Sequence, residues 1–453
     1  MPNKADKCTA VHIPSILLPK KGTDLEKWAV VACDQYTSQE EYWEKADRFV
    51  GDSDSTLRLI LPEVYLEKQD KEDRISRING TMQKYLDEKV LVETKPGFIY
   101  VDRSTSHVQS RKGLVLAVDL EEYDYSKGSR TLIRATEGTV VDRLPPRVKI
   151  REKAPIELPH IMLLIDDPGR TVIEPLDAKK ESLEKLYDFQ LMMDGGRIRG
   201  YKVDEGKLTD EILEALSALA RPEAFTAKYG VGPEKGILLF AVGDGNHSLA
   251  SAKVFWENLK ATLPEEERQC HPARFALVEV VNVHDEGLVF EPIHRVLFNV
   301  DAVGLLNSLV DFFKAFGSRA SYTLLYTEEA MKKETALLNK NGDAHVIAFT
   351  TSEAFGVITV ENPPYNLEVG TLQSFLDDYA NKHGDCKIDY IHGDEVVRSL
   401  GSKKGNMGFY LPAMNKHDLF KTVILDGALP RKTFSMGEAD EKRFYLECRC
   451  ITK

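Results

Sequence analysis

Residues 243–248, Gly-Asp-Gly-Asn-His-Ser, combine an acid and an imidazole with two glycines, between a strand pattern and a helix pattern. Gly243 and Gly245 permit positive φ angles and let a ligand come close to the backbone. If the helix starts at His247 or Ser248, its first N–H groups form a site for an anion. The segment therefore predicts phosphate binding at a helix N-terminus.

The side chains of this segment suit phosphate and metal chemistry. The carboxylate of Asp244 can hold a divalent cation or orient a hydroxyl, and His247 can donate a hydrogen bond to a phosphate oxygen. The alternative interpretation is structural, because Gly-Asp-Gly-Asn is common turn chemistry in which Asp244 and Asn246 would cap the helix. Taken alone, the spacing favours the helix cap.

A second group of candidates lies in residues 131–152, where Arg134, Glu137, Arg143 and Arg147 fall close together. Guanidinium groups stabilise a nearby carboxylate in its charged form. Such a glutamate can deprotonate a bound hydroxyl if it is positioned against it. The alternative is a solvated loop of mixed charge, and the two interpretations carry equal weight.

Two further polar pairs interrupt apolar patterns. His294 and Arg295 lie within the apolar stretch 290–298, and Lys432 follows an arginine in the Pro-containing stretch 426–444. A His-Arg pair between apolar residues is more often a hydrogen-bonded structural pair than a ligand contact, and a basic pair in such a loop is usually solvated. These residues are therefore secondary candidates.

Several reaction classes lose support because their motifs are absent from the sequence. The chain has no G-x-x-x-x-G-K-[ST] phosphate loop, no G-x-S-x-G nucleophile elbow and no H-E-x-x-H helix. Its net charge of −12 disfavours non-specific binding to nucleic acid or to an anionic membrane surface. No stretch has the apolar length of a membrane span or a secretory signal. Six scattered cysteines fit reduced thiols, so we expect a cytoplasmic protein.

The elements that would position these residues follow an irregular order. Strand patterns occupy 97–122 and 158–169, a helix with Thr209 as its cap occupies 208–220, and two strands around a hairpin-like turn occupy 273–298. Because strands and helices do not alternate regularly, we expect an α+β fold with a mixed-sheet core. Near residue 300 the pattern changes to alternating helix and strand segments. This change predicts an N-terminal α+β domain over 1–300 and a C-terminal α/β region over 301–453.

Taken in chain order, these segments resemble the family called domain of unknown function 1015. Its members show a His-Glu-x-Thr segment, an Asp-Gly-His-His-Arg segment, a His-Arg pair on a strand, and a Pro-x-Lys-Ser-Thr stretch near the C-terminus. The resemblance runs over nearly the whole chain. The corresponding segments here are 136–139 (Thr-Glu-Gly-Thr), 244–248 (Asp-Gly-Asn-His-Ser), 294–295 (His-Arg) and 430–434 (Pro-Arg-Lys-Thr-Phe).

This signature is similar to that of ParB/sulfiredoxin-like proteins, some of which are free-serine kinases. The resemblance implies Glu137 as the catalytic base and Arg143 as a substrate or phosphate contact. It implies Asp244 as a metal or hydroxyl partner and His247 as a phosphate contact. The chain departs from the pattern at Thr136, which replaces histidine, and at Ser248, which replaces an arginine well matched to phosphate.

Three functions remain open at this stage. The leading hypothesis is a phosphotransferase that uses ATP or ADP with Mg²⁺ and acts on a small hydroxylated metabolite such as free serine. Its phosphate contacts would come from the backbone and side chains of 243–248, together with Arg143, Arg147, His294, Arg295 and Lys432. The second is a non-catalytic nucleotide or small-molecule sensor. The third is metal-assisted hydrolysis with Asp244, His247 and His294 as ligands. The oligomeric state stays open.

Overall fold

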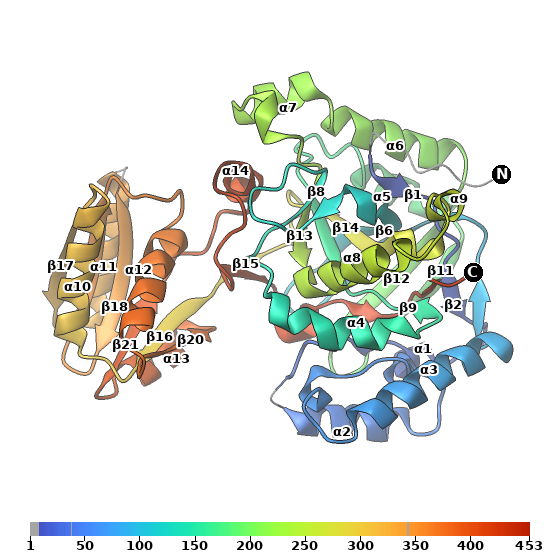
Figure 1. Cartoon of the computed structure of the whole chain (residues 1–453), viewed down its shortest axis with the longest axis horizontal. Coiled ribbons are helices and arrows are strands. Elements are labelled where there is room, and N and C mark those ends of the chain that lie inside the picture. The colour runs from blue at the N-terminus through green and yellow to red at the C-terminus, as the bar shows by residue number, and fades with distance from the viewer. Residues whose placement is uncertain (1–8, 38, 342–343) are drawn as a thin grey trace. The chain divides into compact units, whose positions relative to one another are not determined.

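The computed structural model describes residues 9–37, 39–341 and 344–453. The chain divides into two compact units, whose elements are labelled in Figure 1. Unit 1 comprises Met1–Val289 and Met436–Lys453, and unit 2 comprises Phe290–Ser435. The chain therefore leaves unit 1 once and returns to it for its last residues.

The core of unit 1 is a mixed β-sheet. Its strands are β1 (Val11–His12), β5 (Gly97–Ser104), β6 (Arg111–Asp119), β7 (Tyr123–Asp124), β8 (Ile133–Ala135), β10 (Met162–Ile165), β11 (Lys185–Gln190), β12 (Arg197–Asp204), β13 (Phe240–Asp244) and β14 (Phe275–Asn282). They follow the order β11-β12-β5-β6-β14-β10-β13-β8-β7, with β1 paired to β6. β10 is parallel to β14, and β8 is parallel to both β13 and β7, while the other neighbours are antiparallel. The predicted α+β class with a mixed-sheet core is confirmed.

Both faces of this sheet are covered, which explains the nearly continuous apolar sequence of its central strands. In β6, Leu114 and Leu116 pack into one core cluster, and Val115 between them packs into the cluster on the other face. Trp256 belongs to the first cluster and Trp43 to the second, so each face is closed by a helix that contributes a buried indole.

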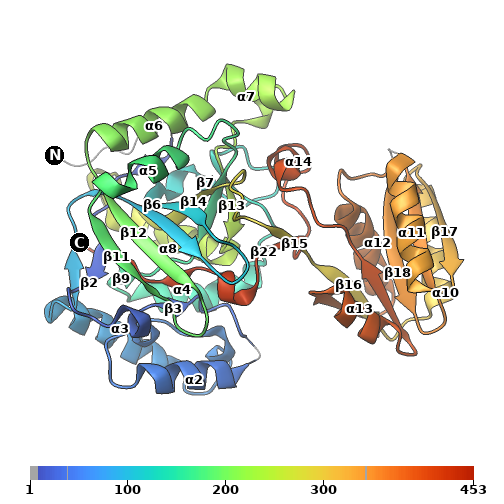
Figure 2. The ribbon, with the colours of Figure 1, turned by 180° about the vertical axis from the view of Figure 1, so that it is seen from behind.

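The helices of unit 1 surround this sheet. They are α1 (Leu25–Trp28), α2 (Glu40–Val50), α3 (Lys71–Asp87), α4 (Leu144–Glu152), α5 (Glu174–Lys179), α6 (Lys207–Leu219), α7 (Pro222–Tyr229), α8 (Asn246–Lys260) and α9 (Glu265–Arg268). α4 and α8 pack side by side, as Figure 1 and Figure 2 show. Short strand pairs complete the unit: β2 (Leu17–Pro19) with β4 (Leu91–Glu93), β3 (Val30–Val31) with β23 (Phe444–Tyr445), and β9 (Ile156–Glu157) with β24 (Arg449–Cys450).

Unit 2 is an antiparallel sheet covered by helices. Its strands are β16 (His294–Phe298), β17 (Arg319–Leu325), β18 (His345–Thr351), β19 (Phe355–Glu361), β20 (Lys387–Ile391) and β21 (Asn406–Tyr410), in the order β17-β19-β18-β21-β16-β20. Its helices are α10 (Ala302–Ala315), α11 (Glu328–Leu338), α12 (Glu368–Lys382), α13 (Asp394–Gly401) and α14 (Leu419–Asp426), and β15 (Phe290–Pro292) pairs with β22 (Phe434–Met436). α10 and α12 pack on one face and α11 on the other.

The structure changes three details of the sequence interpretation. The division of the chain falls at 289–290 rather than at 300, and the last residues, expected in the C-terminal region, pack in unit 1. The predicted hairpin in 273–298 is wrong, because β14 pairs with β6 and β10 whereas β16 pairs with β20 and β21. α6 has Gly206 at its N-cap, and the hydroxyl of Thr209 accepts the N–H of that glycine.

Candidate functional site

Two strand–loop–helix segments meet at one edge of the unit 1 sheet. β8 and β13 are parallel neighbours, with Ile133 opposite Phe240, so the loops that follow them leave at the same edge. The hydroxyl of Thr136 donates to the carbonyl of Val242 across 2.5 Å. Glu137 lies in the loop that runs from Thr136 towards α4, at the edge where α8 begins. The structure therefore brings together the two segments that carry the predicted catalytic residues.

The contact between the two segments continues at the first turn of α8. The N–H of Val140 donates to Nε2 of His247 across 3.3 Å. His247 is thus a hydrogen-bond acceptor for the loop that contains Glu137, a role additional to the predicted contact with phosphate. Sequence reasoning had no signal for this bond, because the partner is a backbone group more than a hundred residues away.

The start of α8 has the glycine geometry that the sequence predicted, one residue earlier than expected. The helix begins at Asn246, and Gly245 at its N-cap has φ 78°. A Cβ on Gly245 would lie 3.0 Å from the Cα of Ile161, so both φ and space require glycine there. Gly243 is different, because a Cβ on it would lie 2.9 Å from Cγ of Leu164. Gly243 therefore serves packing within the sheet.

The alternative in which Asp244 and Asn246 cap this helix is wrong. The N-cap of α8 is Gly245, which makes no side-chain cap bond. Oδ1 of Asp244 accepts the N–H of Gly245 across 2.9 Å, and its Oδ2 lies 3.3 Å from Nζ of Lys442. The N–H groups of a helix's first turn lack an intrahelical acceptor. The first turn of α8 therefore keeps the character of an anion site, and Lys442 adds a positive charge beside it.

Two buried polar atoms at this edge have no hydrogen-bond partner in the part of the chain that the structure describes. They are Oδ1 of Asn246 and Oγ1 of Thr139. Nδ2 of Asn246 is 3.5 Å from the carbonyl of Val242, which fixes the orientation of the amide and leaves Oδ1 as the unpaired atom. Since buried polar atoms are normally paired, these two point to a bound molecule or ordered water.

A buried histidine that sequence reasoning missed lies next to Ser248. Nε2 of His160 is 3.1 Å from Oγ of Ser248 and 3.3 Å from Oδ2 of Asp34, and its Nδ1 is 2.7 Å from the hydroxyl of Tyr445. The Tyr445 hydroxyl in turn lies 3.0 Å from Sγ of Cys33. Ser248, predicted as a phosphate contact, is thus part of a buried polar network.

Burial and neighbouring charges shift the pKa values of His160 and Asp34 in opposite directions. Burial lowers the pKa of His160, but the carboxylates of Asp34, Asp244 and Glu63 outweigh it and raise that pKa above its ordinary value. Burial raises the pKa of Asp34, and the imidazole of His160 outweighs it and holds that pKa well below its usual range. His160 and Asp34 therefore form a charged pair in which the imidazolium donates to both Asp34 and Ser248.

The returning C-terminal segment supplies two side chains to this edge, Lys442 and Tyr445. Buried arginines anchor it: Arg103 donates to the carbonyls of Asp440 and Glu441 across 2.6 and 2.9 Å, and Arg443 pairs with Glu279 and Glu447. Motif reasoning missed Lys442 because it lies almost two hundred residues after Asp244. The family's Pro-x-Lys-Ser-Thr stretch pointed to Lys432 instead.

Arg143 is the N-cap residue of α4, and Arg147 lies in the first turn of that helix. Arg143 is exposed, and its carbonyl accepts Nη1 of Arg147 across 2.7 Å. The other end of the Arg147 guanidinium pairs with Glu63. Arg147 is therefore already engaged by a carboxylate, and its contact with phosphate stays a prediction, as does that of Arg143.

The other predicted residues belong to unit 2, where His294 and Arg295 start β16. The buried guanidinium of Arg295 donates to Gln373 across 2.8 Å and to the carbonyl of Ile293 across 2.7 Å, and it lies 4.5 Å from the ring of Tyr390. Arg295 also donates to the carbonyl of Arg431 across 3.3 Å, so unit 2 brings the 294–295 and 430–432 segments together. Arg295 thus orders unit 2.

His294 is held from both sides of its ring. Nδ1 accepts the N–H of Leu411 across 3.1 Å, and Nε2 lies 3.0 Å from Oδ1 of Asp394. Burial lowers the pKa of His294 against the opposing effect of Asp394, so the neutral ring is favoured. The described residues contain no group of three or more His, Cys, Asp or Glu placed to hold a metal ion. The ligand set proposed for metal-assisted hydrolysis, Asp244, His247 and His294, is therefore not a preformed centre.

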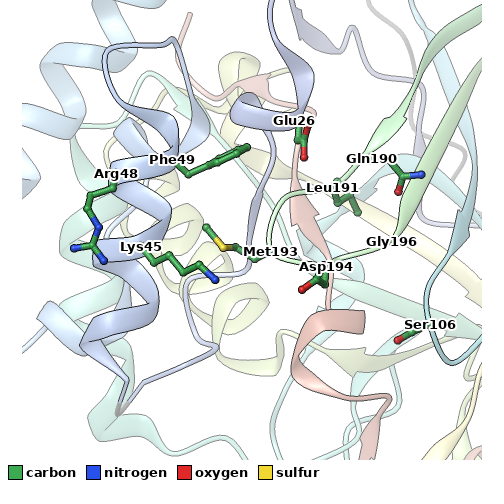
Figure 3. Close-up of a pocket in the computed structure, with 10 residues that line it drawn as sticks. All are labelled: Glu26, Lys45, Arg48, Phe49, Ser106, Gln190, Leu191, Met193, Asp194 and Gly196. Atoms are coloured by element: carbon green, nitrogen blue, oxygen red, sulfur yellow. The ribbon is translucent and has the colours of Figure 1, made fainter.

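Two of the hollows in unit 1 differ in how they relate to the site. One of about 150 Å³ is lined by Ser248 and His160, and so adjoins the site. The other, of about 820 Å³, lies between α2 and the loop that joins β11 to β12. Figure 3 shows Lys45 and Phe49 of α2 on one side of it, facing Met193 and Asp194. None of the predicted site residues lines the larger hollow.

Comparison with protein families shows which family the chain belongs to. The chain matches the family model described as "Protein of unknown function (DUF1015)" over residues 17–379. It belongs to this family. The match includes the Glu137 loop, the 243–248 segment and the His294–Arg295 pair, and it ends before Lys432 and Lys442. No curated protein matches the chain. No helix in the described ranges is long and apolar enough to cross a membrane.

Several solved structures are similar to this DUF1015 chain at low identity. A mutant of free serine kinase in complex with AMP is 11% identical, with a TM-score of 0.39, over 75% of this chain and 91% of that chain. The mutant in complex with ADP is 12% identical, with a TM-score of 0.38, over 77% and 95%. A conserved hypothetical protein from Pyrococcus furiosus is 13% identical, with a TM-score of 0.34, over 73% and 90%.

Proposed function

We propose that this DUF1015 protein is a phosphotransferase that binds a nucleotide at the start of α8 and transfers its terminal phosphoryl group to a small hydroxylated acceptor. One observation carries the proposal: the loop with Glu137 is hydrogen-bonded to the first turn of α8 through Val140 and His247. A helix start binds phosphate through its N–H groups and dipole. A carboxylate held beside it can accept the proton of an attacking hydroxyl.

The charges around the α8 start suit a nucleotide polyphosphate. The ammonium of Lys442 lies 3.3 Å from Asp244 and places a positive charge beside the start of α8. Mg²⁺ bound to a nucleotide is held mainly by phosphate oxygens with one or two protein carboxylates. Asp244 and Glu137 are the carboxylates that fit this role. The unpaired Oδ1 of Asn246 is an acceptor, so it suits a hydroxyl group or a metal-bound water.

The chemical step balances with groups that the chain and the substrates supply. The acceptor hydroxyl attacks the terminal phosphorus, its proton passes to the carboxylate of Glu137, and the bond to the leaving nucleotide oxygen breaks. His160, whose pKa is raised by the carboxylates around it, is not assigned as the base, because both of its ring nitrogens already contact Asp34, Ser248 or Tyr445. Through Ser248, this imidazolium instead adds positive charge near the start of α8, where negative charge moves during transfer.

The second candidate function is a nucleotide sensor without turnover. It is favoured by one observation: Ser248 replaces the arginine of the family signature, and its hydroxyl lies 3.1 Å from His160. A sensor would bind nucleotide through the same helix start. It would need neither an acceptor nor the carboxylate of Glu137.

Turnover measurements separate the two functions. Release of nucleotide product is followed with ATP or ADP, Mg²⁺ and a panel of hydroxylated amino acids headed by serine, for wild type, Glu137→Gln and the exposed control Glu205→Gln. We expect Glu137→Gln to keep nucleotide affinity and to lose about 10² to 10⁴ in turnover, as for removal of a general base. The control should match wild type. Binding without turnover for any acceptor in wild type would contradict the phosphotransferase and support the sensor.

A further inference from the structure

The cavity of about 150 Å³ beside the start of α8 has walls from several segments of unit 1. α8 contributes Ser248 and Ser251, which face the cavity, while His247 meets the Glu137 loop. α4 lies between α8 and α3, packed against α8 and joined to α3 by the ion pair of Lys149 with Glu72. Figure 1 shows these three helices in that order. The cavity and the predicted base therefore meet α8 through different residues.

Polar groups line the cavity at α8 and also along α4. His160 and Tyr445 lie beside the two serines of α8, and the ion pairs Arg147–Glu63 and Arg151–Glu157 line the cavity along α4. The remaining walls are mostly aliphatic. They include Leu59, Ile60, Leu61 and Leu66 from the segment before α3, Met82 from α3, Ile150 and Ala154 from α4 and its end, and Ile156 and Leu158 beyond it.

One wall residue offers an unused hydrogen-bond donor. Arg151 pairs through Nη2 with Glu157, yet its Nε is buried and has no hydrogen-bond partner within the described ranges. A buried guanidinium N–H without an acceptor is costly, and a ring nitrogen or carbonyl oxygen of a ligand would satisfy it. The cavity thus combines aliphatic walls with a lining arginine that has an unused donor.

We infer that this cavity holds the base of the nucleotide whose phosphates lie at the α8 start. The inference rests on the proposed nucleotide binding and adds the place of the base. An engineered cavity of about 150 Å³ in another protein holds benzene, so the volume suits a flat aromatic ring. Aliphatic walls contact the faces of the base, and Arg151 donates to its edge. The sugar bridges Ser248 to the phosphates, which leaves the Glu137 side for the acceptor.

Comparison of nucleotides with tripolyphosphate tests the location of the base. Tripolyphosphate has the same phosphate chain without base or sugar, so it reports on the α8 start alone. Affinities of ATP, GTP and CTP and of tripolyphosphate, each with Mg²⁺, are measured by calorimetry for wild type and for Ala154→Leu, which fills the cavity. Ala261→Leu, at the exposed end of α8, is the matched control. Ile150→Phe, at a half-buried wall position, replaces Ala154→Leu if that variant fails to fold.

In wild type, we expect at least one nucleotide to bind about tenfold or more tightly than tripolyphosphate, because its base is buried. Ala154→Leu should abolish that difference and leave tripolyphosphate unchanged, while Ala261→Leu should behave as wild type. An undiminished preference for the nucleotide in Ala154→Leu would overturn the inference and leave the proposed phosphate site standing. Failure of every nucleotide and of tripolyphosphate to bind wild type would instead remove the proposed function.

Discussion

The backbone N–H of Val140 donates to Nε2 of His247 across 3.3 Å, which ties the loop after β8 to the first turn of α8. The bond requires Nε2 to be unprotonated, so the ring meets the loop as an acceptor. Glu137 precedes Val140 by three residues and lies in the same loop. The position of the proposed base therefore depends on a side chain of the helix that it serves.

Replacement of His247 should release the Glu137 loop. We expect His247→Ala to lower turnover by about tenfold or more through misplacement of Glu137, with a smaller effect on nucleotide affinity. Hydrogen exchange should show faster exchange of the Val140 amide. His247→Gln, whose amide oxygen can accept the same bond, should restore part of the protection. His417→Ala in unit 2 is the control, and unchanged exchange at Val140 in His247→Ala would refute the coupling.

The buried pair of Asp34 and His160 predicts a pH-dependent stability. The raised pKa of His160 means that its contribution is complete below its ordinary pKa and is lost as pH rises through the raised value. The lowered pKa of Asp34 means that its contribution is complete above its ordinary pKa and is lost as pH falls through the lowered value. The pair should stabilise unit 1 most from about pH 4 to about pH 6.5.

Asp34→Asn tests this pair by urea unfolding. We expect a loss of about 3 kcal/mol near pH 6, typical of breaking a buried pair, and a smaller loss near pH 9. The control is Asp54→Asn, since Asp54 lies 4.0 Å from Lys20 in an exposed pair and should cost less than about 1 kcal/mol. An equal loss for Asp34→Asn at both pH values would show that His160 is not charged in the folded protein.

Arg295 should stabilise unit 2 rather than bind phosphate. Arg295→Lys loses the fork that reaches both Gln373 and the Ile293 carbonyl, so we expect the free energy of unfolding of unit 2 to fall by about 2 to 3 kcal/mol. Nucleotide affinity should not change. The exposed Arg319→Lys is the matched control. Weaker nucleotide binding at unchanged stability would instead confirm the phosphate contact that the sequence predicted.

Local sequence patterns predicted the elements near the site well. They did not predict which strands pair with each other. The glycines and polar residues of 243–248 indicated the strand–loop–helix segment, because turn geometry and helix starts depend on neighbouring residues. The hairpin predicted at 273–298 failed because each strand finds its partners far away in the sequence. Strand patterns report burial and extension, and they do not specify which strands pair.

The same limit applies to the site. Glu137 and the 243–248 segment were predicted and meet at one sheet edge. Asp34, His160 and Lys442 were missed, because each is a single polar residue without a spaced partner, and only the fold brings them to α8. His294, Arg295 and Lys432 were grouped with the loop by the order of family segments. That order indicates membership of the family, and it does not determine which residues lie close together in the structure.

The central claim, a nucleotide phosphate site at the start of α8, is tested most directly by thermal unfolding with ATP or ADP and Mg²⁺. A bound ligand raises the midpoint by mass action. We predict a nucleotide-dependent rise for wild type and for the exposed control Gln39→Ala, at the N-cap of α2, and a much smaller rise for Asn246→Ala. The same rise in Asn246→Ala, or no rise in wild type at millimolar nucleotide, would contradict the claim.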